Sequence, residues 1–226
     1  MNSLDNFARL EWHTLKPSLT WRVLLLYAVV AGFITVTISS DTVGPIVPPL
    51  AVAMMVVVMF AGTPFAMAER CNLDGLYVTL GVHRRQVVRG RFVFFVVFAA
   101  TIIVGGCLVA AILSLALGRG VPWDGLGYGA LASFLAACLL VFVQLPVYFR
   151  LGATKARYAA KLPVLILIFA LGSVASLLAQ DRPIPQILAS LAESAAIVAA
   201  AAAVAVALIG AVAYRVAVAL YDNREF

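Results

Sequence analysis

Charged residues are scarce in this chain, and the shortage decides its broad class before any motif is considered. Only 12% of the 226 residues are charged and 64% are hydrophobic, whereas about a quarter of the residues in an average soluble domain are charged. Apolar runs long enough to cross a bilayer recur along the sequence. The chain is therefore predicted to be an integral membrane protein. Its formal net charge of +6 does not indicate nucleic-acid binding.

Motifs for catalysis and for nucleotide binding are also missing. The sequence contains no G-x-x-x-x-G-K-[ST] phosphate loop, no H-E-x-x-H and no G-x-S-x-G. The three cysteines, Cys71, Cys107 and Cys138, do not have the spacing of a disulfide framework or of a metal site. We therefore expect no enzyme activity in this chain, no metal ion and no cofactor of its own.

Six apolar segments are predicted to cross the membrane as helices. Each has at least about 18 residues, which is enough to cross about 30 Å of hydrocarbon. Ahead of them, apolar residues on one helical face, with Trp12 at its margin, predict a helix at about 3–16 that lies in the membrane interface; a frayed tail is the alternative. The spans of this single transmembrane domain, residues 1–226, are placed at about 21–39, 46–66, 92–117, 126–149, 162–179 and 187–213.

Basic residues lie almost entirely on one side of this predicted bundle. Fourteen of the 16 Lys and Arg residues lie near the termini or in the segments 67–91 and 150–161, and only Arg119 and Arg182 lie on the other side. Lys and Arg are retained on the cytoplasmic side of membranes. Both termini and the segment 67–91 are therefore predicted to be cytoplasmic.

The segment 67–91 is the one long polar interruption between apolar spans. Four of its residues recur at helical spacing and predict a short helix with one apolar stripe: Leu73, Leu76, Tyr77 and Leu80. Glu69 is expected in the first turn, where the helix dipole favours an anion, and Gly81 at the end. We interpret this helix as a docking element for a soluble partner. The alternatives are an anchor that only fixes topology, or a stripe that lies on lipid headgroups.

The charged residues of the segment are expected to have two different roles. Glu69 and Asp74 would add charged contacts to the partner, because charges at the rim of an interface tune the rate and register of binding. The basic residues next to the following span would anchor the chain at the membrane surface: Arg84, Arg85, Arg89 and Arg91.

Polar residues within the spans are few. No span carries Asp, Glu, Lys or Arg near its middle, which disfavours a carrier driven by an ion gradient, because a coupled ion needs a ligand at that depth. Gln144, near the inner end of the span 126–149, is expected to form an interhelical hydrogen bond, with a substrate contact as the alternative. Glu193 is expected at the outer boundary of the last span, in an interface or vestibule.

Two stretches resemble one family of membrane proteins. The run PFAMAERCNLDGLYVTLGVHRRQVVRGRF resembles the cytoplasmic segment of small six-span ABC-2 type transporter permeases, although Gly81 stands where that family prefers proline. The terminal AYRVAVALYDNREF is similar to the family's tail. The residues that match the family pattern are Glu69, Leu76, Tyr77, Thr79, Leu80, Arg85, Val88 and Arg91 in the first stretch, and Tyr221, Arg224, Glu225 and Phe226 in the second.

The resemblance implies an all-α integral membrane protein with six transmembrane helices, an N-terminal amphipathic interface helix and a cytoplasmic coupling helix between spans two and three. It also implies a location in the bacterial cytoplasmic membrane, an ABC ATPase subunit that binds ATP and Mg, and a second permease subunit, identical or homologous. The expected activity is export of amphipathic peptides, antibiotics or lipid-like compounds. An ion-coupled carrier, a passive channel, and an assembly or regulatory subunit without a transport path stay open as alternatives.

Overall fold

The structure, a computed structural model, describes residues 27, 29–30, 33, 47–71, 84–118, 120–121, 123–159 and 195–222. Within these ranges the regular structure is entirely helical, which confirms the predicted all-α class for this part of the chain. The elements are α3 (Val47–Phe60), α4 (Thr63–Arg70), α6 (Arg84–Ala116), α7 (Trp123–Ala159) and α10 (Ala195–Asp222).

Four stretches of the described chain are long and apolar enough to cross a membrane. They are Val47–Arg70, Arg85–Ala116, Gly125–Gly152 and Ala196–Tyr221, and they overlap four of the six predicted spans. The last one runs to Tyr221, beyond the predicted end at 213, and residues 187–194 of that predicted span lie outside the described residues. The predicted interface helix at 3–16, the span 162–179 and most of the span 21–39 lie outside the described residues.

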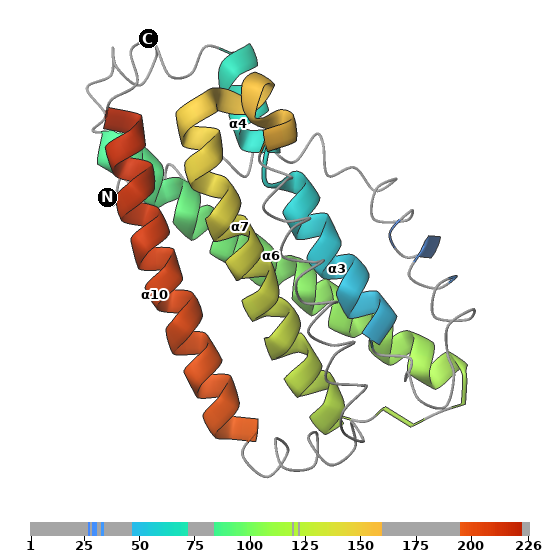
Figure 1. The fold of residues 1–226 in the computed structure, drawn as a ribbon. Helices are drawn as coiled ribbons and strands as arrows, with labels where there is room; N and C mark the ends of the chain where they lie inside the picture. Colours follow the sequence, from blue (N-terminus) through green and yellow to red (C-terminus); the bar gives the residue numbers. More distant parts are fainter. Residues whose placement is uncertain are drawn as a thin grey trace, which may run out of the picture.

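The long helices lie side by side in a bundle, with α4 at one end of it (Figure 1). Helix α7 contacts α3, α4, α6 and α10, and α6 contacts α3, α7 and α10. Helices α6 and α7 therefore form the centre of the described bundle. Helix α7 ends at the end of the bundle opposite to the one where α10 begins (Figure 1).

Proline and glycine set the boundaries of the first helices. Pro48 and Pro49 lie in the first turn of α3, where a missing N–H is tolerated because that group has no partner within the helix. The helix stops at Phe60 and resumes at Thr63 with Pro64 in the opening turn, so the kink that proline predicts there takes the form of a break. At the other end of the bundle, α6 is followed by Gly118 at φ 68°, a left-handed conformation that favours glycine after a helix.

Two helices continue beyond the predicted spans. Helix α7 runs through the predicted loop as far as Ala159, with one non-helical residue, Gly152, at φ 74° and ψ 176°. Helix α10 runs through the predicted tail to Asp222. Its extension is packed rather than solvated, because Ala213, Ala217 and Tyr221, each four residues apart, are buried.

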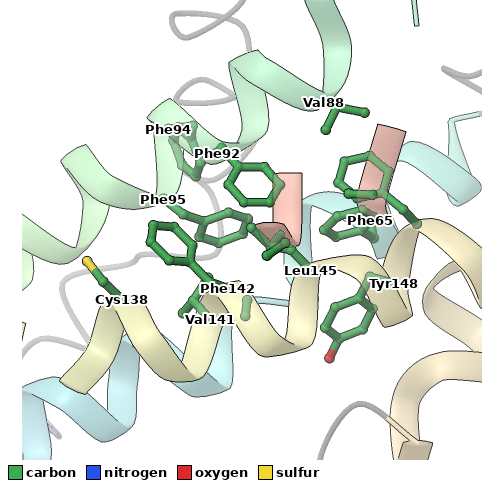
Figure 2. Close-up of a cluster of buried hydrophobic side chains, with 14 of the residues drawn as sticks. Phe65, Val88, Phe92, Phe94, Phe95, Cys138, Val141, Phe142, Leu145 and Tyr148 are labelled. Carbon is green, nitrogen blue, oxygen red and sulfur yellow. The ribbon is translucent and has the colours of Figure 1, made fainter. Parts of the chain in front are cut away.

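The main hydrophobic core joins α3, α4, α6, α7 and α10 and is rich in aromatic rings (Figure 2). Phe92 of α6 stacks on Phe142 of α7 with ring centroids 5.5 Å apart, and meets Tyr214 of α10 edge-on at 5.7 Å. A smaller core cluster consists of Leu50, Ala53 and Ile103. Offset and edge-on ring pairs add to the stabilisation that burial provides, so the aromatic cluster fixes how the central helices sit against one another.

Candidate functional site

The basic residues of the described helices gather at one end of the bundle, which we call the basic end. Figure 1 shows α4, the start of α6 and the ends of α7 and α10 at this end. It carries the charge asymmetry that the sequence predicts, although the side of the membrane that it faces stays a prediction. The residues are Arg70, Arg84, Arg85, Arg89, Arg91, Arg150, Lys155, Arg157 and Arg215.

The arginines at the start of α6 do not behave as one group. Arg85 and Arg89 are exposed and, being four residues apart, lie on one face of the helix. That face continues into Val93 and Val97, which are 45% and 57% exposed. Two exposed arginines therefore lie beside an exposed apolar stripe, and their role as a membrane anchor stays a prediction. Arg84 opens the same helix.

Arg91 departs from the expected placement, because it is only 2% exposed. Each residue advances an α-helix by about 100°, so two residues beyond Arg89 the side chain points to the opposite face and into the bundle. Its guanidinium carbon lies 4.3 Å from the ring centroid of Phe65 and 5.5 Å from that of Phe149. A guanidinium over aromatic faces is attracted by their negative potential. Arg91 therefore links α6 to α4 and α7.

Aromatic residues surround this arginine and join the ends of three helices. Phe65 of α4 stacks on Tyr148 with centroids 5.1 Å apart and meets Phe149 edge-on at 5.0 Å. Tyr221 of α10 covers Phe149 from another side at 5.4 Å. Gly62 allows this approach, because a Cβ at that position would lie 2.7 Å from the hydroxyl oxygen of Tyr148. The start of α4 is thus held closely against α7.

Glu69 lies at the other end of α4. The sequence places it in the first turn of a partner-facing helix, whereas the structure places it in the last turn of α4, which ends at Arg70. Its Oε2 accepts two hydrogen bonds from Thr154 of α7, one from the backbone N at 3.1 Å and one from Oγ1 at 2.7 Å. The carboxylate that was expected to face a partner protein therefore binds this chain's own α7.

The position of Thr154 explains why a carboxylate suits it. Gly152 interrupts α7 with a non-helical conformation, and Thr154 follows two residues later, in the first turn of the resumed helix. The first N–H groups of a helix lack partners within it and favour a negative charge nearby. Glu69 supplies the acceptor that a capping side chain normally provides, but from a different helix.

The remaining predicted site residues fall into two groups. Gln144 is buried at 2% exposure, as an interhelical residue should be, yet its Oε1 has no hydrogen-bond partner among the described residues. Outside the described residues lie Leu73, Asp74, Leu76, Tyr77, Leu80 and Glu193.

Sequence reasoning missed Phe65, Phe149 and Thr154 as site residues. Phe65 and Phe149 look like ordinary span residues in the sequence, because nothing local shows that they enclose an arginine. The signal for Thr154 is slight: it follows a glycine by two residues in a segment that otherwise favours helix. The arrangement joins α4, α6, α7 and α10 at the basic end, and the predicted docking segment follows α4 in the sequence.

Comparison with known proteins gives one result. A family model described as ABC-2 family transporter protein matches residues 13–222. The matched region contains the four membrane-spanning stretches and every residue of the basic end described above. No curated protein and no solved structure matches the chain.

Proposed function

Since the chain belongs to the ABC-2 family of transporter proteins, we propose that it is the permease subunit of an ABC exporter. Membership of the family implies the membrane subunit of an ABC transporter, with an ABC ATPase as a partner in general. The proposed substrates are amphipathic peptides, antibiotics or lipid-like compounds, moved outward. The observation that carries the proposal is the family match over residues 13–222.

The energy source follows from what the sequence lacks. A chain without a phosphate-binding loop has to receive the free energy of ATP hydrolysis through contacts with another subunit. A ligand or partner shifts a conformational equilibrium only as far as it binds one state better than the other. We propose that a separate ATPase subunit binds ATP and Mg, and that a second permease subunit, identical or homologous, completes the transporter.

The proposed docking site for the ATPase is the segment that follows α4, at the basic end. An interface needs a buried apolar anchor, and the stripe of Leu73, Leu76, Tyr77 and Leu80 supplies one, with Asp74 at its rim. Glu69 is assigned a different role from the one that its sequence position suggests, because Thr154 already occupies its carboxylate. The basic end would face the cytoplasm, in keeping with the distribution of Lys and Arg.

The test is co-purification of the chain with its ATPase, followed by substitution within the stripe. Leu76→Asp or Tyr77→Asp should release the ATPase, or reduce substrate-stimulated ATP hydrolysis about tenfold or more, because each places an unpaired carboxylate in an apolar contact and Tyr77→Asp also removes an aromatic anchor that can contribute about 2 kcal/mol or more to binding. Arg84→Ala is the matched control at the same end and should have a milder effect. Both measurements are made in nanodiscs, with membrane insertion checked in parallel.

Two results would contradict the proposal. Normal ATPase retention and stimulation in both aspartate variants would show that the segment is only a surface anchor. Transport driven by an ion gradient, with no ATPase present, would favour a carrier instead. The purified chain alone should hydrolyse no ATP, because it has no nucleotide-binding motif.

A further inference from the structure

We propose that Glu69 and Thr154 form a clasp that makes α4 and the end of α7 move as one unit, so that force applied next to α4 reaches α7. Both are positioning residues in this proposal, since neither is assigned a contact with substrate or nucleotide. The proposal rests on the proposed function for the origin of that force. Its structural part, the clasp itself, stands on the contacts of the described helices alone.

The first observation is the geometry of the clasp. One carboxylate oxygen of Glu69 accepts both donors of Thr154, at 3.1 Å and 2.7 Å, across 85 residues of sequence. Hydrogen bonds to an ionised acceptor are shorter and stronger than neutral ones. Two donors on one residue also fix its orientation, since the backbone N–H and the side-chain hydroxyl cannot both be satisfied if the turn rotates.

The second observation is the interruption of α7 at Gly152, which we treat as a hinge. Gly152 interrupts α7 with a non-helical conformation, at φ 74° and ψ 176°, a positive-φ conformation that glycine adopts at little steric cost. The turn that carries Thr154 is therefore joined to the rest of α7 through a residue at which the helix is interrupted. Its direction has to be set by contacts elsewhere, and Glu69 provides one.

The third observation is that α4 contacts α7 on both sides of this hinge. Phe65 packs on Tyr148 and Phe149, before Gly152, and one turn further along α4, Glu69 binds Thr154, after Gly152. Because α4 is attached to α7 on both sides of Gly152, it restricts bending of α7 at that residue. While the clasp is closed, a tilt of α4 has to carry the segment after Gly152 with it.

The consequence is a route between two cytoplasmic segments that are distant in sequence. Residues 72–83 follow α4 directly and contain the proposed docking stripe, and the turn held by the clasp leads into the segment after α7. Displacement of the first segment by a docked ATPase would pull on the second through Glu69. Loss of the clasp should leave ATPase binding intact and make each hydrolysed ATP less effective.

The functional test uses Thr154→Val, which removes the hydroxyl donor and keeps the branched shape. In the assembled transporter we expect substrate moved per ATP to fall about twofold to fivefold, because this exposed contact loses one of its two hydrogen bonds, with ATPase retention and basal hydrolysis unchanged. Thr154→Ser restores the hydroxyl and should restore coupling. Thr101→Val is the matched control, because the Thr101 hydroxyl donates to the Val97 carbonyl of its own helix.

A spectroscopic test examines the clasp without any partner or transport assay. Spin labels are placed on the native, exposed Cys71 and on Lys155→Cys, with Cys107 and Cys138 replaced by alanine, in nanodiscs. The distance distribution between the labels should be narrow in the background protein and broader with Glu69→Ala or Thr154→Val.

The outcomes separate the two proposals. A distribution that Glu69→Ala leaves unchanged would overturn the clasp and would leave the proposed function intact. Normal coupling in Thr154→Val would show that the clasp does not transmit force, and so would a loss that Thr154→Ser fails to restore. Transport by the wild-type chain without ATP would overturn the proposed function and, with it, the role of the clasp in coupling.

Discussion

The two ends of the described bundle are built in different ways. At the basic end, aromatic rings enclose Arg91, and Phe65 and Phe149 are 3% and 0% exposed. At the opposite end Trp123 and Leu115 are 70% and 65% exposed, and the core there is the small cluster around Leu50. Densely packed interiors transmit displacement because they deform little. Among the described helices, the comparison indicates a rigid end at the basic residues and an opposite end where fewer buried contacts resist separation.

Helix α6 shows the same contrast within one element. Its first half buries four phenylalanines, Phe92, Phe94, Phe95 and Phe98, whereas its second half buries the smaller Ile103, Ala110 and Ser114. Fewer and smaller buried side chains mean fewer dispersion contacts to break when helices shift. The difference between the ends is therefore a property of the sequence of the central helix.

The largest effect is expected when the two ends are labelled from opposite sides of the membrane, because each end should react from one side only. A membrane-impermeant thiol reagent should label Cys71, at the basic end, only in inverted vesicles, because Lys and Arg favour the cytoplasmic side. Gly120→Cys, exposed at the opposite end, should be labelled only in intact spheroplasts. The reverse pattern would invert the orientation and place the docking segment outside the cell.

A second experiment disrupts the packing of the basic end by substituting its buried arginine. Arg91→Ala should lower the free energy of unfolding by about 2 kcal/mol or more, because it removes a desolvated guanidinium from two aromatic faces and leaves a cavity. Arg89→Ala, two residues away and exposed, should change it by less than about 0.5 kcal/mol. Arg91→Lys should fall between them, because an ammonium cannot stack on a ring as a planar guanidinium does.

Thermal unfolding in detergent, followed by circular dichroism, measures this difference. Equal melting temperatures for Arg91→Ala and Arg89→Ala would show that the buried arginine contributes nothing to the rigidity of its end, and the contrast between the two ends would then rest on the aromatic rings alone.

A smaller difference in stability is expected between alanine substitutions at two glycines, Gly62 and Gly105. Gly62→Ala should destabilise the protein by about 1–3 kcal/mol through overpacking, because the new Cβ would lie 2.7 Å from the Tyr148 hydroxyl oxygen. Gly105→Ala in α6 has no atom within 4 Å of its Cβ, so it should be neutral or stabilising by up to about 1 kcal/mol. Adding Tyr148→Phe removes the closest atom and should recover part of the loss at Gly62. If Gly62→Ala is as stable as Gly105→Ala, α4 is not held as closely as the contact indicates.

Much of the bundle is readable from the sequence because it depends on local rules. Apolar length predicts the four described spans, proline predicts the interruption at Pro64, and a glycine after an apolar run marks the end of α6. The burial of Ala213, Ala217 and Tyr221 follows from their spacing of four, a signal that was available in the segment interpreted as a tail.

The site was less predictable because it depends on direction and on distant contacts. Treating the arginines of 84–91 as one basic group hides the rotation that turns Arg91 inward while Arg89 stays exposed. The partner of Glu69 lies 85 residues away, and no local pattern in a single sequence indicates such a pair. The exposed basic face of α6 therefore follows from composition, whereas the contact between Glu69 and Thr154 requires the fold.

The contact of Tyr221 with Phe149 also bears on how the protein is made. Because α10 follows α6 and α7 in the chain, it is synthesised after them, and chains fold from the N-terminal side during translation. Until α10 is inserted, the rings of Phe149 and Phe92 lack Tyr221 and Tyr214, which cover them in the folded protein. An unfinished chain therefore leaves these two rings uncovered, and their burial is the step of assembly that α10 completes.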